Sequence, residues 1–245
     1  MCVTDRLNGL SALITGASSG IGEATARLLA SEGAKVALFA RREERIVRLA
    51  EELGKDALAL PGDITSRDDV LSAVEKAVGR FGHIDVLVNN AGIMPLSAIA
   101  ERRVDDWDRM IDVNIKGVLY AIDAVLPGML SRDSGHVVNI SSLAGWRVSP
   151  TSAVYAATKF AVRAISDGLR CETAGKIKVT AIYPGIVETE LFEGVSSVAI
   201  RDKLEELKDR HAMPASAIAE AILYVVTQPP SVGVNDIIIS PPGAP

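Results

Sequence analysis

"LITGASSGIGEA" spans residues 13–24 and joins a short apolar run to the start of a helical pattern. Its glycines, Gly16, Gly20 and Gly22, have the spacing G-x-x-x-G-x-G. Glycine permits a tight turn and a close approach of the backbone to a bound phosphate, and the N-terminus of the following helix offers N–H groups to an anion. A plain strand-to-helix turn is the simpler alternative, but it does not require three glycines and two adjacent serines. The stretch therefore predicts a phosphate-binding turn at the first crossover of an α/β fold.

Short apolar runs alternate with longer helical patterns along the rest of the chain. Most of these runs are continuous, which is typical of strands buried on both faces of a parallel sheet. Seven strands alternating with helices predict a doubly wound α/β fold in one domain, residues 1–245. The predicted strands are residues 11–15, 35–40, 57–61, 85–90, 136–141, 178–183 and 235–240, and the clearest helices lie in 22–33, 42–54 and 66–82.

One long stretch, residues 184–214, has no strand pattern. A loop of this length inside a compact domain is usually a functional lid or a mobile loop. It contains Gly194 and a helix-like run at 196–210. We expect a lid at about 186–213 that is mobile without ligand and becomes ordered over a bound substrate.

Composition excludes several classes of function. The chain of 245 residues is 48% hydrophobic, enough for one large core, and its net charge of -5 is scattered without a basic stripe, so nucleic acid is not an expected partner. No apolar run reaches the roughly 18 residues of a membrane span, and the N-terminus does not resemble a signal peptide. Cys2 and Cys171 suggest no disulfide framework, which favours the cytoplasm. No metal site is expected, because no ligand-like spacing occurs among His83, His136 and His211.

The end of the second predicted strand, "LFARRE" at 38–43, indicates which dinucleotide binds. An Asp or Glu at this place bonds the ribose 2′-OH of NAD, whereas an Arg accommodates the 2′-phosphate of NADP. Here Ala40 takes the acidic position, and Arg41 and Arg42 follow it. An ordinary basic helix start is the alternative, but cations are mildly unfavourable at a helix N-terminus. The stretch predicts NADP.

A second motif, "VYAATKF" at 154–160, places Tyr155 four residues before Lys159. Four residues make one helical turn, so the two side chains share a face. A nearby ammonium group favours the phenolate and lowers the tyrosine pKa from about 10 toward a value suited to proton transfer. A Tyr-x-x-x-Lys pattern alone is weak, and its meaning depends on the rest of the chain.

Taken together, the motifs resemble the short-chain dehydrogenase/reductase family, in its single-domain branch with TGxxxGxG and YxxxK. The resemblance implies a Rossmann-type, seven-stranded parallel sheet in a three-layer α/β/α sandwich, a nicotinamide cofactor, and hydride transfer between that cofactor and an alcohol or carbonyl. It also implies a homotetramer or homodimer that associates through helices around 104–130 and 155–174. The motifs are "TGASSGIG" (15–22), "GDIT" (62–65), "NNAG" (89–92), "DVNIKG" (112–117), "NISS" (139–142), "YAATK" (155–159) and "YPGIVET" (183–189).

The same resemblance assigns roles to single positions. Tyr155 matches the catalytic acid/base, Lys159 the residue that holds the nicotinamide ribose, and Ser142 the catalytic serine that stabilises a developing alkoxide, with Ser141 as its cofactor-side neighbour. Asn114 matches the residue that orders a proton-relay water. The predicted cofactor-binding residues are Gly16, Ser18, Ser19, Gly20, Ile21, Gly22, Arg41, Arg42, Asp63, Ile64, Asn90, Ala91, Gly92, Tyr155, Lys159, Pro184, Gly185, Ile186 and Thr189.

The substrate is less determined by the sequence. The predicted pocket walls are mostly apolar, so we expect a small to medium carbonyl or alcohol, and Arg147 either meets a substrate carboxylate or is a solvated loop arginine. The stretches 102–117 and 189–194 resemble the subgroup of clavulanic-aldehyde reductases and NADP-dependent 3-hydroxy acid dehydrogenases. A catalytically silent NADP-binding sensor or scaffold and an NAD-preferring dehydrogenase remain alternatives. The predicted walls are Met94, Trp146, Arg147, Leu191, Phe192 and Val195.

Overall fold

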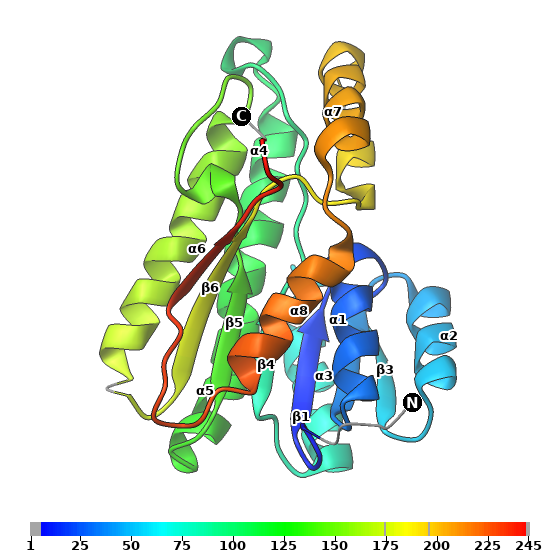
Figure 1. The fold of residues 1–245 in the computed structure, drawn as a ribbon, viewed down its shortest axis with the longest axis vertical. Coiled ribbons are helices and arrows are strands. Elements are labelled where there is room, and N and C mark those ends of the chain that lie inside the picture. The colour runs from blue at the N-terminus through cyan, green and yellow to red at the C-terminus, as the bar shows by residue number, and fades with distance from the viewer. Residues whose placement is uncertain (1–5, 174, 196, 244–245) are drawn as a thin grey trace.

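The computed structural model describes residues 6–173, 175–195 and 197–243. Its centre is one seven-stranded sheet, in which every neighbouring pair is parallel and the order is β3-β2-β1-β4-β5-β6-β7 (Figure 1). This confirms the Rossmann-type, doubly wound fold. The strands are β1 (Ser11–Thr15), β2 (Lys35–Ala40), β3 (Ala57–Pro61), β4 (Val86–Asn89), β5 (His136–Ile140), β6 (Lys178–Pro184) and β7 (Asp236–Ile239).

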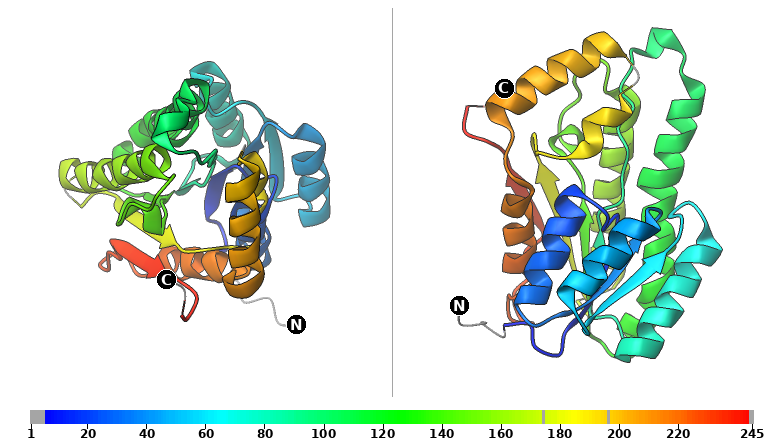
Figure 2. Two further views of the ribbon diagram at one scale, coloured as in Figure 1. Left: turned by 90° about the horizontal axis from the view of Figure 1, so that it is seen from above. Right: turned by 90° about the vertical axis from the view of Figure 1, so that its right-hand side faces the viewer.

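Helices cover both faces of the sheet and form the outer two layers (Figures 1 and 2). One face carries α1 (Gly20–Ser31), α2 (Glu43–Leu53) and α8 (Ala215–Val226), and the other carries α3 (Arg67–Phe81), α5 (Gly117–Ser131) and α6 (Ala153–Glu172). Two more helices, α4 (Val104–Ile111) and α7 (Val198–His211), extend beyond the ends of the strands. Short 3-10 turns occur at η1 (Ile99–Glu101), η3 (Leu143–Gly145) and η4 (Glu190–Gly194).

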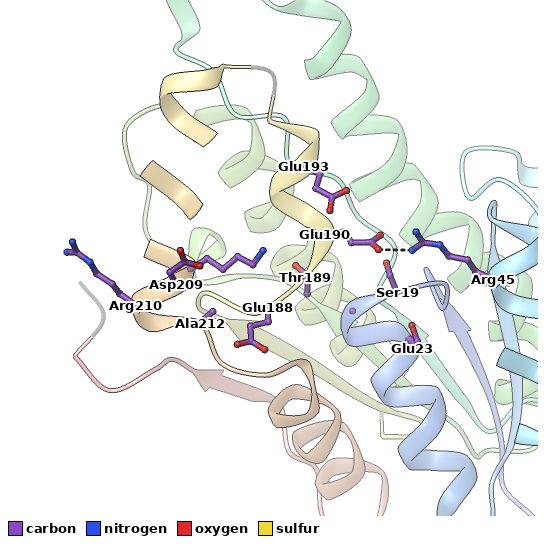
Figure 3. Close-up of a pocket in the computed structure, with 12 residues that line it drawn as sticks. Ser19, Glu23, Arg45, Glu188, Thr189, Glu190, Glu193, Asp209, Arg210 and Ala212 are labelled. Carbon is purple, nitrogen blue, oxygen red and sulfur yellow. Dashed lines mark hydrogen bonds and ion pairs between the residues drawn. The ribbon is translucent and has the colours of Figure 1, made fainter. Parts of the chain in front are cut away.

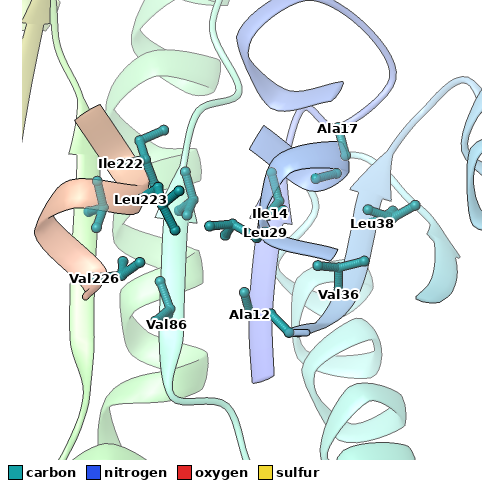
Figure 4. Close-up of a cluster of buried hydrophobic side chains, with 14 of the residues drawn as sticks. Ala12, Ile14, Ala17, Leu29, Val36, Leu38, Val86, Ile222, Leu223 and Val226 are labelled. Atoms are coloured by element: carbon teal, nitrogen blue, oxygen red, sulfur yellow. The ribbon is translucent and has the colours of Figure 1, made fainter. Parts of the chain in front are cut away.

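The central strands of the sheet are buried on both faces because their alternate side chains enter different cores. In β1, Ala12 and Ile14 pack toward α1 and α8, whereas Leu13 packs toward α3 and α5. Figure 4 shows the first of these cores, where Leu29 of α1 and Ile222 of α8 meet the strands. All five of these side chains are at most 2% exposed, which explains why the strands read as continuous apolar runs.

The longest helical stretch, Val104–Ser131, is long and apolar enough to cross a membrane by length and composition. In the fold this stretch packs against the sheet: α5 contributes Val118, Ala121 and Met129 to the hydrophobic core on the face covered by α3, α5 and α6. A π-helical turn, η2 (Asp112–Lys116), separates α4 from α5. Turns of this kind are rare in proteins, and many of those that do occur lie at functional sites.

The predicted catalytic and cofactor-binding residues lie close to the carboxyl ends of the strands. The sheet order reverses between β1 and β4, since β1 connects outward to β2 while β4 lies on its other side. In doubly wound sheets a ligand binds in the crevice at such a switch point.

Cys171 is an exposed free thiol, and Cys2 lies outside the described residues.

A buried histidine lies at the start of β5, far from that crevice. His136 is 4% exposed, and its Nε2 lies 2.8 Å from Oγ1 of Thr180, whose own proton is donated to the carbonyl oxygen of Val234. Nε2 therefore carries the proton, and Nδ1 has no partner among the described residues. Burial, reinforced by the charge of Lys178, lowers the pKa of His136 to about 3.

We expect the free energy of unfolding to fall as the pH drops from 6.5 toward 3. In this window the unfolded histidine binds a proton that the folded one excludes, which costs up to about 1.4 kcal/mol per pH unit. The contribution is complete above the unfolded pKa and is lost below it. Urea unfolding at several pH values measures the slope. His136→Gln keeps a donor for Thr180 and should flatten the slope. An equal slope in H136Q and wild type would contradict the assignment.

Candidate active site

The glycine loop between β1 and α1 is braced by the end of β4. Nδ2 of Asn90 donates to the carbonyl oxygens of Thr15 (3.0 Å) and Gly16 (3.2 Å), while Oγ1 of Thr15 accepts from the backbone N–H groups of Asn90 and Ala91. Gly16 has a φ of +67°, and a Cβ there would lie 2.9 Å from the Cα of Ala91. Only glycine permits this backbone conformation together with such close contact between the two loops.

The glycine loop and the loop after β4 border a cavity of about 1000 Å³. A cavity of this size is at the upper end for ligand pockets. It runs from the glycine loop, past the ends of β4 and β5, to the segment that follows β6. The predicted residues that line it are Gly16, Ser18, Ser19, Gly20, Ile21, Arg41, Arg42, Asp63, Ile64, Asn90, Ala91, Gly92, Ser142, Tyr155, Lys159, Pro184, Gly185, Ile186 and Thr189.

Two predicted site residues do not line the cavity. Gly22 faces inward, where a Cβ would collide with the carbonyl oxygen of Gly16, so its role is to let α1 pack against the loop. Asn114, on the π-helical turn, is fully buried. Its Oδ1 accepts from the backbone N–H of Ile93, and its Nδ2 donates to the Ile93 carbonyl and to Oγ1 of Thr158. Both ends of the side chain are thus occupied, and Asn114 fixes the loop after β4 to α6.

Ser142 and Tyr155 meet on the wall of the cavity. Ser142 ends the extended segment after β5, and its Oγ accepts a hydrogen bond from the backbone N–H of Ala144 at 3.1 Å. Because that oxygen accepts from the backbone, its own proton is available to the nearby Tyr155 hydroxyl, and this contact acts to lower the pKa of the tyrosine. Tyr155 lies in the first turn of α6 and is 6% exposed. The two hydroxyl groups therefore converge on one point.

Lys159 lies one turn further along α6. Its Nζ donates to the carbonyl oxygen of Ile140, the last residue of β5, at 2.9 Å. The same Nζ is 5.8 Å from the centroid of the Tyr155 ring. α6 is also fixed to β5 by Ser141, whose Oγ donates to the backbone carbonyl of Lys159 at 3.0 Å. The spacing of four residues thus brings both side chains to the end of one strand, as the sequence predicts.

The ionisation of this pair differs from the expectation. Burial raises the pKa of Tyr155 to about 12, and the hydrogen bond from Ser142 only partly opposes this effect. Burial also lowers the pKa of Lys159 to about 8. In the protein alone, desolvation therefore outweighs the attraction of the lysine for the phenolate. The neutral phenol is the stable form, which suits a proton donor.

The two arginines after β2 have different environments. Arg42 donates through Nε to Ser18 (3.0 Å), through Nη2 to Ser19 (2.6 Å) and through Nη1 to Glu190 (2.5 Å). Arg41 is exposed and lines the cavity, and its side chain makes no hydrogen bond or ion pair with a described residue. The sequence does not distinguish the two arginines, and it does not identify Glu190 as a site residue. The only available indication of Glu190 was an acidic side chain in the segment after β6 that could pair with the arginines after β2.

The segment after β6 forms one side of the cavity. Its two ends are joined, because the backbone N–H of Met213 donates to Ile186 and that of Glu188 donates to Met213. Between these ends lie η4 and α7, so the helix-like run predicted near 196–210 is a helix. Phe192 packs with Met94 and Tyr155 in a small apolar cluster.

The outer part of the cavity is only partly as predicted. Met94, Leu191, Phe192 and Arg147 line it, but Trp146 and Val195 do not. Val195 is buried, at 1% exposure, inside the apolar cluster. Trp146 points away to stack with Arg163, whose guanidinium carbon is 3.7 Å from the ring centroid. Additional cations line the cavity at Arg109 and Lys203.

These residues fit a dinucleotide. The glycine loop and the N-terminus of α1 suit a pyrophosphate, the arginines after β2 suit a further anion, and Ser142, Tyr155 and Lys159 lie deeper in the same cavity. Asp63 lines the cavity, and its carboxylate is fixed by accepting hydrogen bonds from the backbone N–H and hydroxyl of Thr65. Among the described residues there is no cluster of three side chains able to hold a metal ion.

Comparison with known proteins agrees with this geometry. Residues 11–198 match the short chain dehydrogenase family. An uncharacterised oxidoreductase of Staphylococcus saprophyticus is 47% identical over 233 residues, which cover 94% of each chain. A closed form of serine dehydrogenase complexed with NADP+ superposes with a TM-score of 0.88 at 35% identity, covering 95% of each chain.

A third comparison shows that the cofactor differs among similar structures. The 3-ketoacyl-(acyl-carrier-protein) reductase from Brucella melitensis, complexed with NADH, superposes with a TM-score of 0.85 at 32% identity, covering 96% of this chain and 98% of that chain. The fold and the site thus support a nicotinamide cofactor. This protein belongs to the short-chain dehydrogenase/reductase family of oxidoreductases.

Proposed function

We propose that this protein, as one catalytic domain in the cytoplasm, is an NADP(H)-dependent oxidoreductase that interconverts a carbonyl compound and an alcohol. The observation that carries the proposal is the convergence of Ser142, Tyr155 and Lys159 at the inner end of a cavity that begins at the glycine loop. A silent sensor would not need a phenol and a serine hydroxyl side by side on the wall of the cavity. The arrangement is that of a proton donor beside an oxyanion site.

A bound nicotinamide supplies or accepts the hydride. The residues of the chain handle the oxygen and the proton. In reduction, Ser142 donates a hydrogen bond to the carbonyl oxygen as negative charge develops, and Tyr155 transfers its proton to that oxygen. Lys159 lies where a cation stabilises the phenolate that remains and where its ammonium group reaches a ribose hydroxyl. In oxidation the same groups act in reverse, with the Tyr155 phenolate as the base.

Asn114 contributes to this chemistry by positioning. Its side chain fixes the loop at Ile93 to Thr158 on α6, and thereby sets the distance between the two walls of the cavity.

The preference for NADP rests on the residues after β2. Arg41 lines the cavity with its donors unused by the described residues, and Ala40, 7% exposed, places no carboxylate there. A 2′-phosphate would gain charge-assisted hydrogen bonds at this place, whereas the 2′-OH of NAD would find no carboxylate at the end of β2. An NAD-preferring dehydrogenase is the alternative that the cofactor experiment in the Discussion decides.

A small or medium substrate that carries a carboxylate is the more specific candidate. Arg109, Arg147 and Lys203 line the same cavity as Tyr155, together with apolar side chains such as Met94 and Phe192. Cations at the edge of an apolar pocket suit the acid group of a hydroxy or oxo acid. One structural neighbour is a serine dehydrogenase, which supports this class.

A screen of NADPH oxidation tests the proposed function. The panel pairs each aldehyde or ketone with an analogue that carries a carboxylate two or three bonds away, and it includes quinones. We expect turnover of carbonyl compounds, with a lower KM for the acidic member of a pair. NADPH binding without turnover of any carbonyl compound would favour the sensor.

We propose that the subunits form a tetramer or dimer through α4, α5 and α6. Ile111 (38% exposed), Leu119 (44%) and Phe160 (38%) are large apolar side chains left at the surface of these helices. Light scattering should give a multiple of 25.9 kDa. Leu119→Glu should lower the measured mass, whereas Val47→Glu on α2 should not; a monomeric wild type would refute the proposal.

The segment 186–213 is proposed to act as the lid over the substrate. Because its two ends are joined at Ile186 and Met213, η4 and α7 would move as one body. Phe192 and Leu191 would then exclude water from the reacting carbonyl.

A further inference from the structure

One ion-pair cluster joins the lid to the arginines after β2. The carboxylate of Glu190, the first residue of η4, accepts from Nη1 of Arg42 at 2.5 Å through Oε2 and from Nη1 of Arg45 at 2.7 Å through Oε1. Figure 3 shows Glu190 reaching across toward Arg45 of α2, above Ser19 of the glycine loop. The hydrogen bonds from Arg42 and Arg45 lower the pKa of Glu190 to about 2. Glu190 is therefore an anion at any working pH.

The position of Arg42 makes this contact relevant to cofactor binding. Its remaining donors point to Ser18 and Ser19, so the guanidinium lies over the glycine loop. Arg42 and Glu190 both line the cavity, beside Arg41. The proposed function puts the 2′-phosphate of NADP at this end of the cavity, and the inference depends on that placement. A lid carboxylate thus occupies one of the two arginines that a phosphate would use.

We infer that Glu190 competes with the 2′-phosphate for Arg42 and so sets how strongly the protein discriminates NADP(H) from NAD(H). Two anions on one guanidinium repel each other at close range, so a phosphate gains the full attraction of Arg42 only when Glu190 withdraws. NAD has no 2′-phosphate and leaves the contact in place. Arg45 can keep Glu190 after Arg42 has turned to the phosphate, so the lid shifts without being released.

The contact is weak enough to be exchanged. The side chains of Arg42 and Glu190 are 43% and 37% exposed, and ion pairs with that much access to water contribute little to stability. A dianionic phosphate held by further groups of the cofactor is the stronger partner for an arginine fork. The competition therefore reduces the affinity for the phosphate without preventing binding.

Calorimetric titration with two nicotinamide-free probes tests the inference. Adenosine 2′,5′-bisphosphate carries the 2′-phosphate, whereas 5′-AMP lacks it. Glu190→Gln should bind the bisphosphate about three- to tenfold more tightly than wild type, with the affinity for 5′-AMP unchanged. The gain should shrink at high salt. Glu193→Gln is the matched control: it removes the same charge from η4, but Glu193 forms no ion pair with Arg42 and acts on Arg45 only at longer range, so the ratio of the two affinities should change little.

Equal affinity of E190Q and wild type for the bisphosphate would overturn the inference. Weaker binding by E190Q would overturn it as well, since Glu190 would then orient Arg42 for the phosphate. A wild type that binds both probes equally would count against the NADP preference, yet a gain in E190Q alone would still support competition. The two ideas thus fail separately.

Hydrogen exchange gives a second readout that does not depend on turnover. In wild type, the bisphosphate should speed the exchange of amides in η4, because it draws Arg42 away from Glu190. 5′-AMP should have no such effect. In E190Q the exchange should already be fast without a ligand. Equal exchange in η4 with both probes would contradict the inferred exchange of partners.

Discussion

Tyr155→Phe should lower the rate of carbonyl reduction by at least about 100-fold while the affinity for NADPH stays close to that of wild type. Phenylalanine keeps the ring in its buried position on α6 and removes only the hydroxyl, which is the group that lies beside Ser142 at the cavity. The hydride donor and the serine remain, so binding persists and proton transfer fails. Single-turnover kinetics with NADPH fluorescence measures both quantities in one experiment.

Two further variants make this result specific. Tyr224→Phe removes a phenol from the exposed face of α8 and should leave the rate unchanged. Lys159→Ala should lower both turnover and cofactor affinity, because it removes the ammonium group that lies beside Tyr155 and near Ile140. Near-normal turnover in Y155F would remove Tyr155 from the proposed chemistry.

The fold could be predicted well because its signal is local. Each predicted strand overlaps an observed strand, and they differ by at most one residue at either end. A strand buried on both faces must be apolar throughout, and glycines such as Gly33 and Gly54, both with positive φ, mark where helices end. The rule that crossovers are right-handed and short restricts the possible strand orders, and the observed order is one that it allows.

The predicted site residues lie together for the same reason, since they follow the carboxyl ends of parallel strands. Contacts between distant segments were not predictable. Asn90 braces a loop that lies about 75 residues earlier, and Glu190 pairs with an arginine 148 residues away; neither contact leaves a periodic pattern. The π-helical turn around Asn114 also has no propensity signal, because it depends on packing against Ile93 and α6.

Arg41 and Arg42 illustrate the limit most clearly. Both follow β2, and in sequence they are equivalent candidates for a phosphate. In the structure the side chain of Arg42 is bound to two serines and a lid carboxylate, whereas that of Arg41 makes no hydrogen bond or ion pair with any residue that the structure describes. The first contact of an incoming 2′-phosphate is therefore expected at Arg41.

Wild-type protein should prefer NADPH to NADH by about 100-fold or more in kcat/KM. The fork of Arg41 can make two charge-assisted hydrogen bonds to the phosphate, each contributing roughly 1.5–3 kcal/mol, and about 1.4 kcal/mol corresponds to a factor of ten. Arg41→Ala should weaken the preference without abolishing it, because Arg42 and Ser18 remain at the same end of the cavity. Arg48→Ala, further along α2 and outside the cavity, is the control and should change neither value.

The double variant Ala40→Asp with Arg41→Ala should reverse the preference. Ala40 ends β2 and lines the cavity, so a carboxylate there can accept from the 2′-OH of NAD and would repel a phosphate. Attraction for one cofactor and repulsion of the other change together, which is why the reversal needs only two substitutions. Steady-state kinetics with both cofactors on the wild type and the variants decides the matter. A wild type that uses NADH as efficiently as NADPH would show that the arginines after β2 do not form a phosphate site, and the NAD-preferring alternative would then hold.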